Sequence, residues 1–201
     1  ALGESFPLAD QIADKVIYTG LVCPEPAPLP DERFDIVVSA GGGAVGAGMV
    51  AAAGAAAHLL PDLGRWCLIT GPNLAQANFD SLAATLPPHV QLERFRTDFA
   101  SLLRGARLSV SQAGYNTVGD ILQAGCRALL IPFAKLGETE QADRARRLAA
   151  LGRATVLEDE ALTPETLADA IRAALALPEP AALAAIKTDG ASETARILRR
   201  L

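Results

Sequence analysis

From residue 34 to residue 175 the sequence alternates between short runs rich in β-branched residues and longer segments with helical periodicity. The expected strands are Ile36–Ser39, Trp66–Thr70, Val90–Glu93, Leu108–Ser111, Ala128–Pro132 and Ala154–Leu157. The expected helices are Val45–Leu60, Leu74–Leu86, Asp98–Leu103, Asn116–Ala124, Thr139–Leu151 and Thr163–Leu175. Such alternation favours a parallel sheet with helices on both faces. The pattern therefore predicts an α/β fold, a doubly wound, Rossmann-like parallel sheet of about six strands.

Two local signals support the helices of this pattern. The first expected helix places its apolar residues on one face, namely Val45, Met49, Ala52, Ala53, Ala56 and Leu60. At the start of the last one, Thr163 and Pro164 form an N-cap followed by proline at the first helical position. The first signal predicts a buried side, and the second predicts a helix start.

The two ends of the chain differ from this regular part. Residues 1–33 are irregular, with one short strand expected at Lys15–Gly20 and a stiff spacer formed by Pro24, Pro26, Pro28 and Pro30. We expect this segment to be a linker arriving from an N-terminal domain that the sequence lacks. Residues 34–201 form one domain in this interpretation, and two helices, Glu179–Ile186 and Ser192–Leu201, complete it.

Composition excludes several classes of function. The chain has 18 basic and 23 acidic residues and no basic stripe with interleaved aromatic residues, so nucleic acid is not an expected partner. Cys23, Cys67 and Cys126 form no CxxC pattern, and we interpret them as buried thiols of a cytoplasmic protein. His58 and His89 lie far in sequence from any cysteine, so no metal-ligand spacing exists.

One segment resembles a membrane span in composition only. Ile36–Pro61 contains no Asp, Glu, Lys or Arg, but three consecutive glycines interrupt it, and most of the remainder is Ala and Gly. Such residues drive membrane insertion weakly, so a strand, a glycine loop and a helix are the better interpretation. The first residues carry acidic side chains and lack the basic start of a signal peptide.

A glycine-rich segment, Ser39-Ala40-Gly41-Gly42-Gly43-Ala44-Val45-Gly46, follows the first expected strand and opens the first helix. Backbone N–H groups and a helix N-terminus can face an anion there, and glycine allows close approach of a phosphate. The segment is neither a GxGxxG dinucleotide fingerprint nor a Walker A loop. A tight strand-to-helix turn is an equally good reading of this motif alone.

The segment Ser111-Gln112-Ala113-Gly114-Tyr115-Asn116-Thr117-Val118-Gly119-Asp120 joins another strand to a helix. Gly114 permits a sharp turn, and Asn116 or Thr117 can cap the helix. Asp120 lies three residues after Thr117, which is the spacing of a capping box. A carboxylate there can also accept both hydroxyls of a ribose if it faces a ligand, so both roles remain open.

A third motif, Ile131–Phe133 followed by Glu138–Gln141, lies at the next strand-to-helix junction. Glu140 and Gln141 present a carboxylate and an amide that can bind the hydroxyls of a sugar ring. Alternatively, Thr139 caps the helix and Glu140 interacts with its dipole. Three such motifs after three strands of one parallel sheet meet at a single edge, and this joint placement favours ligand binding.

In order and spacing these motifs resemble the C-terminal domain of glycosyltransferases with the GT-B fold. The closest resemblance is to the family-28 type, which includes bacterial peptidoglycan N-acetylglucosaminyltransferases. It runs from about Tyr18 to the C-terminus and is strongest over Arg107–Gly152. The resemblance implies that the domain is one half of a GT-B fold and binds a UDP-sugar as substrate. It also implies that no metal or other cofactor is needed, because helix dipoles and amides neutralise the diphosphate.

The resemblance implies a set of donor-binding residues: Gly42, Gly43, Gly46, Phe95, Arg96, Gly114, Tyr115, Asp120, Glu140 and Gln141. The glycine loop 42–46, with Gly114 and Tyr115, would hold the diphosphate through backbone amides. The backbone around Phe95 and Arg96 would hold the edge of the uracil.

Three positions differ from the family pattern. Asp120 stands where the family has a glutamate on the ribose, and Glu140 and Gln141 stand where it often has Gln-Gln or Asp-Gln on the sugar. An arginine that the family places shortly after the Thr-Gly of the linker, here at 19–20, is missing, and Pro24 stands near that point.

The expected function is that of the donor-binding half of an inverting glycosyltransferase, with no catalytic residue assigned in this chain. The acceptor site and the catalytic base would come from an N-terminal domain, in cis or as a partner chain in trans. Only that half would touch the inner face of the membrane, and the rest would be cytoplasmic. The alternatives are a non-catalytic nucleotide-binding module and a relative of sugar-nucleotide epimerases.

Overall fold

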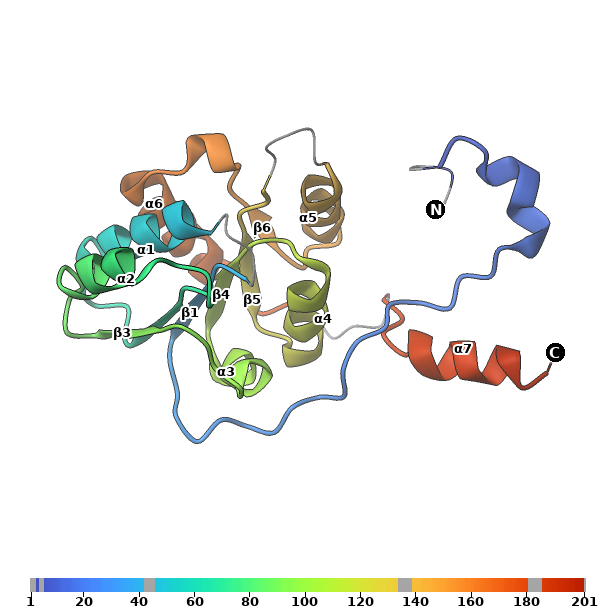
Figure 1. Cartoon of the computed structure of the whole chain (residues 1–201), viewed down its shortest axis with the longest axis horizontal. Coiled ribbons are helices and arrows are strands. Elements are labelled where there is room, and N and C mark those ends of the chain that lie inside the picture. The colour runs from blue at the N-terminus through green and yellow to red at the C-terminus, as the bar shows by residue number, and fades with distance from the viewer. Residues whose placement is uncertain (1–2, 4–5, 42–45, 134–138, 181–185, 201) are drawn as a thin grey trace. The chain divides into compact units, whose positions relative to one another are not determined.

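The computed structural model describes residues 3, 6–41, 46–133, 139–180 and 186–200 (Figure 1). The chain divides into two compact units. The larger one is Pro24–Leu183, and the smaller one combines Ala1–Cys23 with Ala184–Leu201. The assignment of residues 1–33 as a linker and of residues 34–201 as a donor-binding domain concerns function and stays a prediction.

The larger unit is built on one sheet. Its strands are β1 (Ile36–Ser39), β2 (Trp66–Ile69), β3 (Val90–Glu93), β4 (Leu108–Ser111), β5 (Arg127–Leu130) and β6 (Thr155–Val156). They lie in the order β3-β2-β1-β4-β5-β6, and every neighbouring pair is parallel. The order changes direction between β1 and β4, which is the switch point where ligands bind in such folds. The predicted doubly wound α/β sheet is therefore confirmed.

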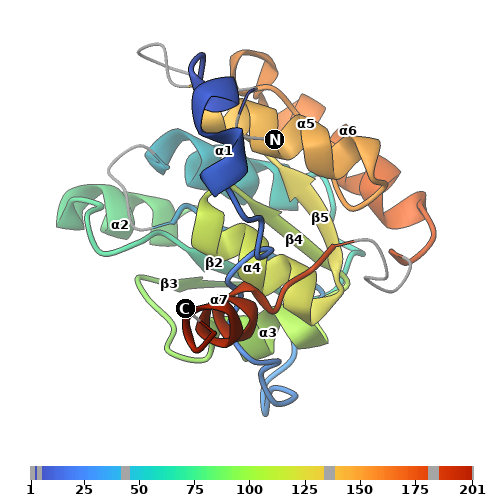
Figure 2. The same cartoon turned by 90° about the vertical axis from the view of Figure 1, so that its right-hand side faces the viewer.

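Helices cover both faces of this sheet (Figure 1). One side carries α1 (Ala47–His58), α2 (Gln76–Ala83) and α6 (Pro164–Ala176). The other side carries α3 (Phe99–Gly105), α4 (Tyr115–Ala124) and α5 (Glu140–Ala150), and Figure 2 shows α4 in front of β4. A 3-10 turn, η4 (Asp159–Ala161), precedes α6.

The core differs in character between the two faces. Beneath α1 and α6 it is apolar, formed by side chains that include Ile36, Val38, Trp66, Leu68, Leu108, Val110, Met49, Ala53 and Ile171. Of the predicted apolar face of the first helix, Met49, Ala53, Ala56 and Leu60 are buried and Ala52 is partly buried, while Val45 lies outside the described residues. The opposite face of β4 carries Ser109 and Ser111, both fully buried. Their hydroxyl groups have no hydrogen-bond partner within the described residues.

One of the predicted helix starts is confirmed, and one predicted helix is not. Thr163 caps α6 as predicted, because its Oγ1 accepts the N–H of Thr166 at 3.2 Å while the N–H of Thr163 donates to Thr166 Oγ1 at 2.9 Å. Pro164 is the first helical residue. The predicted helix Glu179–Ile186 is wrong at Glu179, Pro180 and Ile186, which are not helical, and residues 181–185 lie outside the described part.

The smaller unit contains a 3-10 helix, η2 (Ala9–Lys15), and an α-helix, α7 (Gly190–Leu198). A single antiparallel bridge pairs Val22 with Asp189. The predicted strand Lys15–Gly20 is wrong, because Lys15 ends η2 and residues 16–20 share no ladder of hydrogen bonds with a strand of the described residues. Within the described residues, no helix has both the length and the apolar character of a membrane span.

The cysteines are free thiols. Cys67 and Cys126 are buried as predicted, and burial raises the pKa of each thiol to about 12. Cys23 is only half-buried, so the prediction of three buried thiols is wrong at this position.

Candidate functional site

The predicted site residues follow strands whose carboxyl ends meet at one edge of the sheet. Gly46 lies between β1 and α1, and Phe95 and Arg96 lie in the loop after β3. Gly114 and Tyr115 lie where the loop after β4 leads into α4. Glu140 begins α5, after β5. Gly42 and Gly43 lie outside the described residues, so their role as phosphate ligands stays a prediction.

The loops after β1 and β2 contact each other closely. Ser39 Oγ accepts the N–H of Gly41 at 3.3 Å, and Gly41 has a φ of +71°. Gly71 has a φ of +77°, and a Cβ there would lie 2.4 Å from the carbonyl oxygen of Gly41. A side chain at Gly71 would separate the two loops, and the positive φ of Gly41 favours glycine there.

Gly46 supports the start of α1. A Cβ at this position would lie 2.2 Å from the Cβ of Ala40, which directly follows β1. The absence of a side chain lets the helix pack against the end of the strand, as glycine does in the turns of dinucleotide-binding folds. Gly46 thus has a packing role of its own, beside its predicted role in holding a phosphate.

Helix α4 begins at Tyr115, with Gly114 as the N-cap residue and no side-chain cap. The predicted capping by Asn116 or Thr117 is therefore wrong, since both lie within the first turn. The N–H groups of a first turn have no intrahelical acceptor and form an anion-binding position. The structure thus presents the start of α4 at the carboxyl end of β4.

Asp120 lies in the second turn of α4, one turn too late for a capping box. The carboxylate is half-buried, and burial raises its pKa above the usual range of aspartate. Among the described residues it has no hydrogen-bond or ion-pair partner. A half-buried carboxylate without a structural partner is suited to accept hydrogen bonds from ligand hydroxyls.

Arg144 joins α5 to the loop after β4. Its Nη1 donates to the carbonyl oxygen of Ala113 at 2.6 Å, and its Nη2 pairs with Glu140. The guanidinium also lies over the ring of Tyr115, at 5.8 Å from the ring centroid. Sequence reasoning missed Arg144, although its spacing of four residues from Glu140 is the signal of a helical ion pair.

The other predicted sugar-binding residue, Gln141, is tied to the end of β5. Its Oε1 accepts the N–H of Phe133 at 3.3 Å, which leaves its NH2 group to donate. Glu140 keeps most of its side chain exposed, at 74%, despite the pair with Arg144. Two polar groups of opposite hydrogen-bonding character therefore stand side by side at the start of α5.

The loop after β3 holds its two predicted residues differently. Phe95 is 66% exposed, whereas the Arg96 guanidinium is bonded to Asp98 at 2.8 and 2.9 Å. The Arg96 side chain lowers the pKa of Asp98. Within the described residues the backbone N–H and C=O groups of Phe95 and Arg96 make no hydrogen bond. An exposed aromatic ring can stack on a planar base, and unbonded backbone groups beside it can form hydrogen bonds with the edge of that base.

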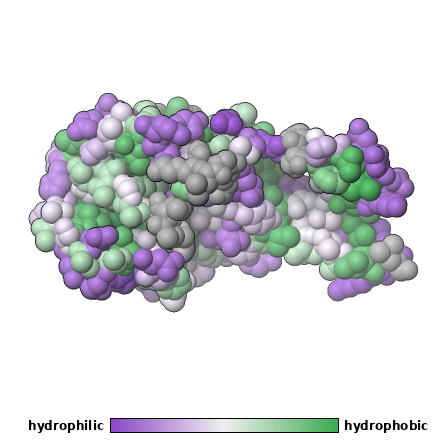
Figure 3. All heavy atoms as spheres, turned by 45° about the horizontal axis from the view of Figure 1, so that its top comes forward, coloured by the Kyte–Doolittle hydropathy of each residue, from purple (hydrophilic) through white to green (hydrophobic). Residues whose placement is uncertain are grey.

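The edge offers hydrogen-bond donors, carboxylates and exposed aromatic rings. In the described part of the chain, no group of three or more His, Cys, Asp or Glu side chains is placed to hold a metal ion. On the face drawn in Figure 3, hydrophilic residues line most of the outline and hydrophobic residues form separate patches. These groups are suited to bind a polar ligand that carries both an anionic group and hydroxyl groups.

Comparison with known protein families shows which family of ligand-binding domains this chain belongs to. Residues 37–200 match the glycosyltransferase family 28 C-terminal domain. The chain belongs to this family. The resemblance identified in the sequence is therefore confirmed, and with it the assignment of the sheet as one half of a GT-B fold.

A named relative agrees with this membership, and solved structures agree with the fold. The UDP-N-acetylglucosamine–N-acetylmuramyl-(pentapeptide) pyrophosphoryl-undecaprenol N-acetylglucosamine transferase of Brucella anthropi is 33% identical over 180 residues, covering 85% of this chain and 47% of that protein. MurG of Acinetobacter baumannii superposes with a TM-score of 0.71 at 22% identity, covering 86% of this chain and 51% of that one. The spinosyn rhamnosyltransferase SpnG complexed with thymidine diphosphate gives 0.65 at 21% identity, covering 93% and 53%. The chain spans about half the length of these proteins.

Proposed function

We propose that the chain binds a UDP-sugar and is the donor-binding half of an inverting glycosyltransferase. One observation carries the proposal: a member of this family gathers, at one sheet edge, close-packed glycine loops, the start of α4 and the half-buried carboxylate of Asp120. The name of the Brucella anthropi relative, a UDP-N-acetylglucosamine transferase, supports UDP as the nucleotide.

The proposal assigns each part of the donor to a group of matching chemistry. The diphosphate faces the loop after β1 and the first turn of α4, because both offer backbone N–H groups. The ribose hydroxyls donate to Asp120, and the sugar hydroxyls interact with Glu140 and Gln141. The base interacts with the backbone of Phe95 and Arg96. Helix dipoles and amides then stabilise the leaving diphosphate without a metal ion.

The other half of the reaction belongs to a second domain in this proposal. That domain holds the acceptor and the catalytic base, either in the same polypeptide or as a partner chain. The relatives' greater length supports this division, since the chain covers only 47% of the Brucella anthropi protein. We propose a cytoplasmic location, with membrane contact only through the second domain, which the free thiols support.

Binding of nucleotides to the purified chain tests the proposal. Calorimetric titration with UDP, dTDP, ADP and NAD should rank UDP first, with a Kd between micromolar and millimolar, on the order of −4 to −8 kcal/mol. If dTDP binds more tightly than UDP, the proposed donor would be a dTDP-sugar in place of a UDP-sugar. Equal or tighter binding of NAD would overturn it in favour of another nucleotide-binding module.

A further inference from the structure

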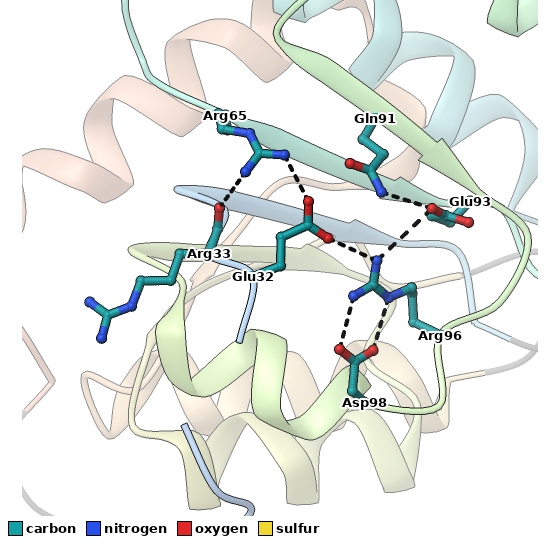
Figure 4. A network of polar contacts seen from close by, with 7 residues as sticks. All are labelled: Glu32, Arg33, Arg65, Gln91, Glu93, Arg96 and Asp98. Carbon is teal, nitrogen blue, oxygen red and sulfur yellow. Dashed lines mark hydrogen bonds and ion pairs between the residues drawn. The ribbon is translucent and has the colours of Figure 1, made fainter. Parts of the chain in front are cut away.

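A cluster of charged side chains connects the loop after β3 to other segments of the larger unit (Figure 4). Arg96 lies at its centre, bonded twice to Asp98 and once to Glu32 at 3.2 Å, with Glu93 at 3.9 Å. Glu32 belongs to the segment before β1 and also accepts a bond of 2.9 Å from Arg65, before β2. The cluster therefore joins the loop to segments far away in the sequence.

Three of the five N–H donors of the Arg96 guanidinium are used within the cluster. Only 19% of the Arg96 side chain is exposed, and its planar guanidinium makes a two-pronged contact with Asp98 that lysine cannot reproduce. These carboxylates raise the pKa of Arg96 further, which keeps its charge fixed. The loop instead presents the exposed ring of Phe95, and the backbone of residues 95–96 makes no hydrogen bond within the described residues.

We propose that Glu32 and Arg96 are positioning residues for the nucleobase, a role that rests on the proposed function above. Arg96 fixes the shape of its own loop through Asp98 and fixes the position of the loop on the sheet through Glu32. Backbone groups recognise a base edge only when they are held in place, and a loose loop must be ordered on binding, which weakens affinity. Neither residue touches the base through its side chain.

The first test asks whether Glu32 holds the loop, and it needs no ligand. The variants are Glu32→Ala, which removes the anchor, and Arg65→Ala, which removes a Glu32 ion pair but leaves the contact with Arg96. In 15N relaxation measurements, order parameters of the Phe95 and Arg96 amides should fall from about 0.85 to below about 0.6 in Glu32→Ala alone. Unchanged values in Glu32→Ala would overturn the proposal.

The second test compares UDP with inorganic pyrophosphate, which lacks the base. In Glu32→Ala and in Arg96→Lys the Kd for UDP should rise about tenfold, while the Kd for pyrophosphate should stay within about twofold. Arg65→Ala should change neither. Equal weakening of both ligands, or an unchanged Kd for UDP, would overturn the positioning role while leaving the proposed function intact. Failure of the unaltered chain to bind UDP would overturn both.

Discussion

Nη1 of Arg144 lies 2.6 Å from the carbonyl oxygen of Ala113, so a residue of α5 holds the turn that leads into α4. The same guanidinium pairs with Glu140 and covers the ring of Tyr115. One side chain thus sets the relative position of the sugar-binding and diphosphate-binding groups that we propose.

Replacement of Arg144 by methionine should therefore weaken binding of the whole donor. We expect the Kd for a UDP-sugar to rise about tenfold, because a charged hydrogen bond to Ala113 and the pairing of Glu140 are both lost. Arg146→Met is the matched control, since among the described residues Arg146 pairs only with exposed Asp143 on the same helix. Calorimetry on the two variants measures the difference, and equal effects would contradict a role of Arg144 in the site.

The Asp120 carboxylate should make donor binding dependent on pH. Burial raises its pKa, and only the ionised form accepts hydrogen bonds from both ribose hydroxyls. Affinity for UDP should therefore fall as the pH is lowered through that raised pKa. In Asp120→Asn the affinity should be about tenfold weaker at pH 7, and this part of the pH dependence should vanish. Calorimetry across a series of buffers checks both.

Stability should change in the opposite direction at the same residue. The pKa of Asp120 is higher in the folded state than in the unfolded state. The free energy of unfolding therefore decreases as the pH rises from the unfolded-state pKa through the folded-state pKa. Above both values the decrease is constant, so Asp120→Asn should unfold at an equal or higher temperature at pH 7. Asp169→Asn, at an exposed position of α6, serves as control. A clear loss of stability in Asp120→Asn would point to a structural role.

The fold followed from patterns that repeat along the chain. The central strands β1 and β4 are buried on both faces, so their short runs containing Ile, Leu and Val were enough to predict them. The predicted strand Lys15–Gly20 failed, and the predicted helix Glu179–Ile186 failed at Glu179, Pro180 and Ile186. An isolated apolar run does not reveal whether a neighbouring strand exists, and only tertiary contacts determine that.

The site was less accessible to sequence reasoning than the sheet. Loop motifs made Gly114 and Asp120 candidates, which stays a prediction, but the start of α4 at Tyr115 was missed because Asn116 and Thr117 are better caps by composition. The contact between Glu32 and Arg96 joins residues 64 positions apart, and no periodicity relates them. Such contacts depend on how the strands are ordered in the sheet.

The two glycines at the start of α1 should respond in opposite ways to alanine. Gly46→Ala places a Cβ 2.2 Å from that of Ala40 and should reduce the free energy of unfolding by about 1–3 kcal/mol. Gly48 has no atom within 4 Å of the added Cβ, so Gly48→Ala should raise it by about 0.5 kcal/mol. Urea denaturation measures both. Equal effects would contradict the tight packing of α1 on β1.

The isolated chain should transfer no sugar, even with a UDP-sugar and a lipid acceptor present. General-base catalysis requires a group within hydrogen-bond reach of the acceptor hydroxyl. Of the acids at the described part of the edge, Glu140 is paired with Arg144, and Asp120 is assigned to the ribose. Assays with a radiolabelled donor should therefore show hydrolysis background only. Adding the N-terminal domain of a relative is the positive control for the assay. Turnover above background by the chain alone, abolished in Glu140→Ala, would show that this half carries its own base.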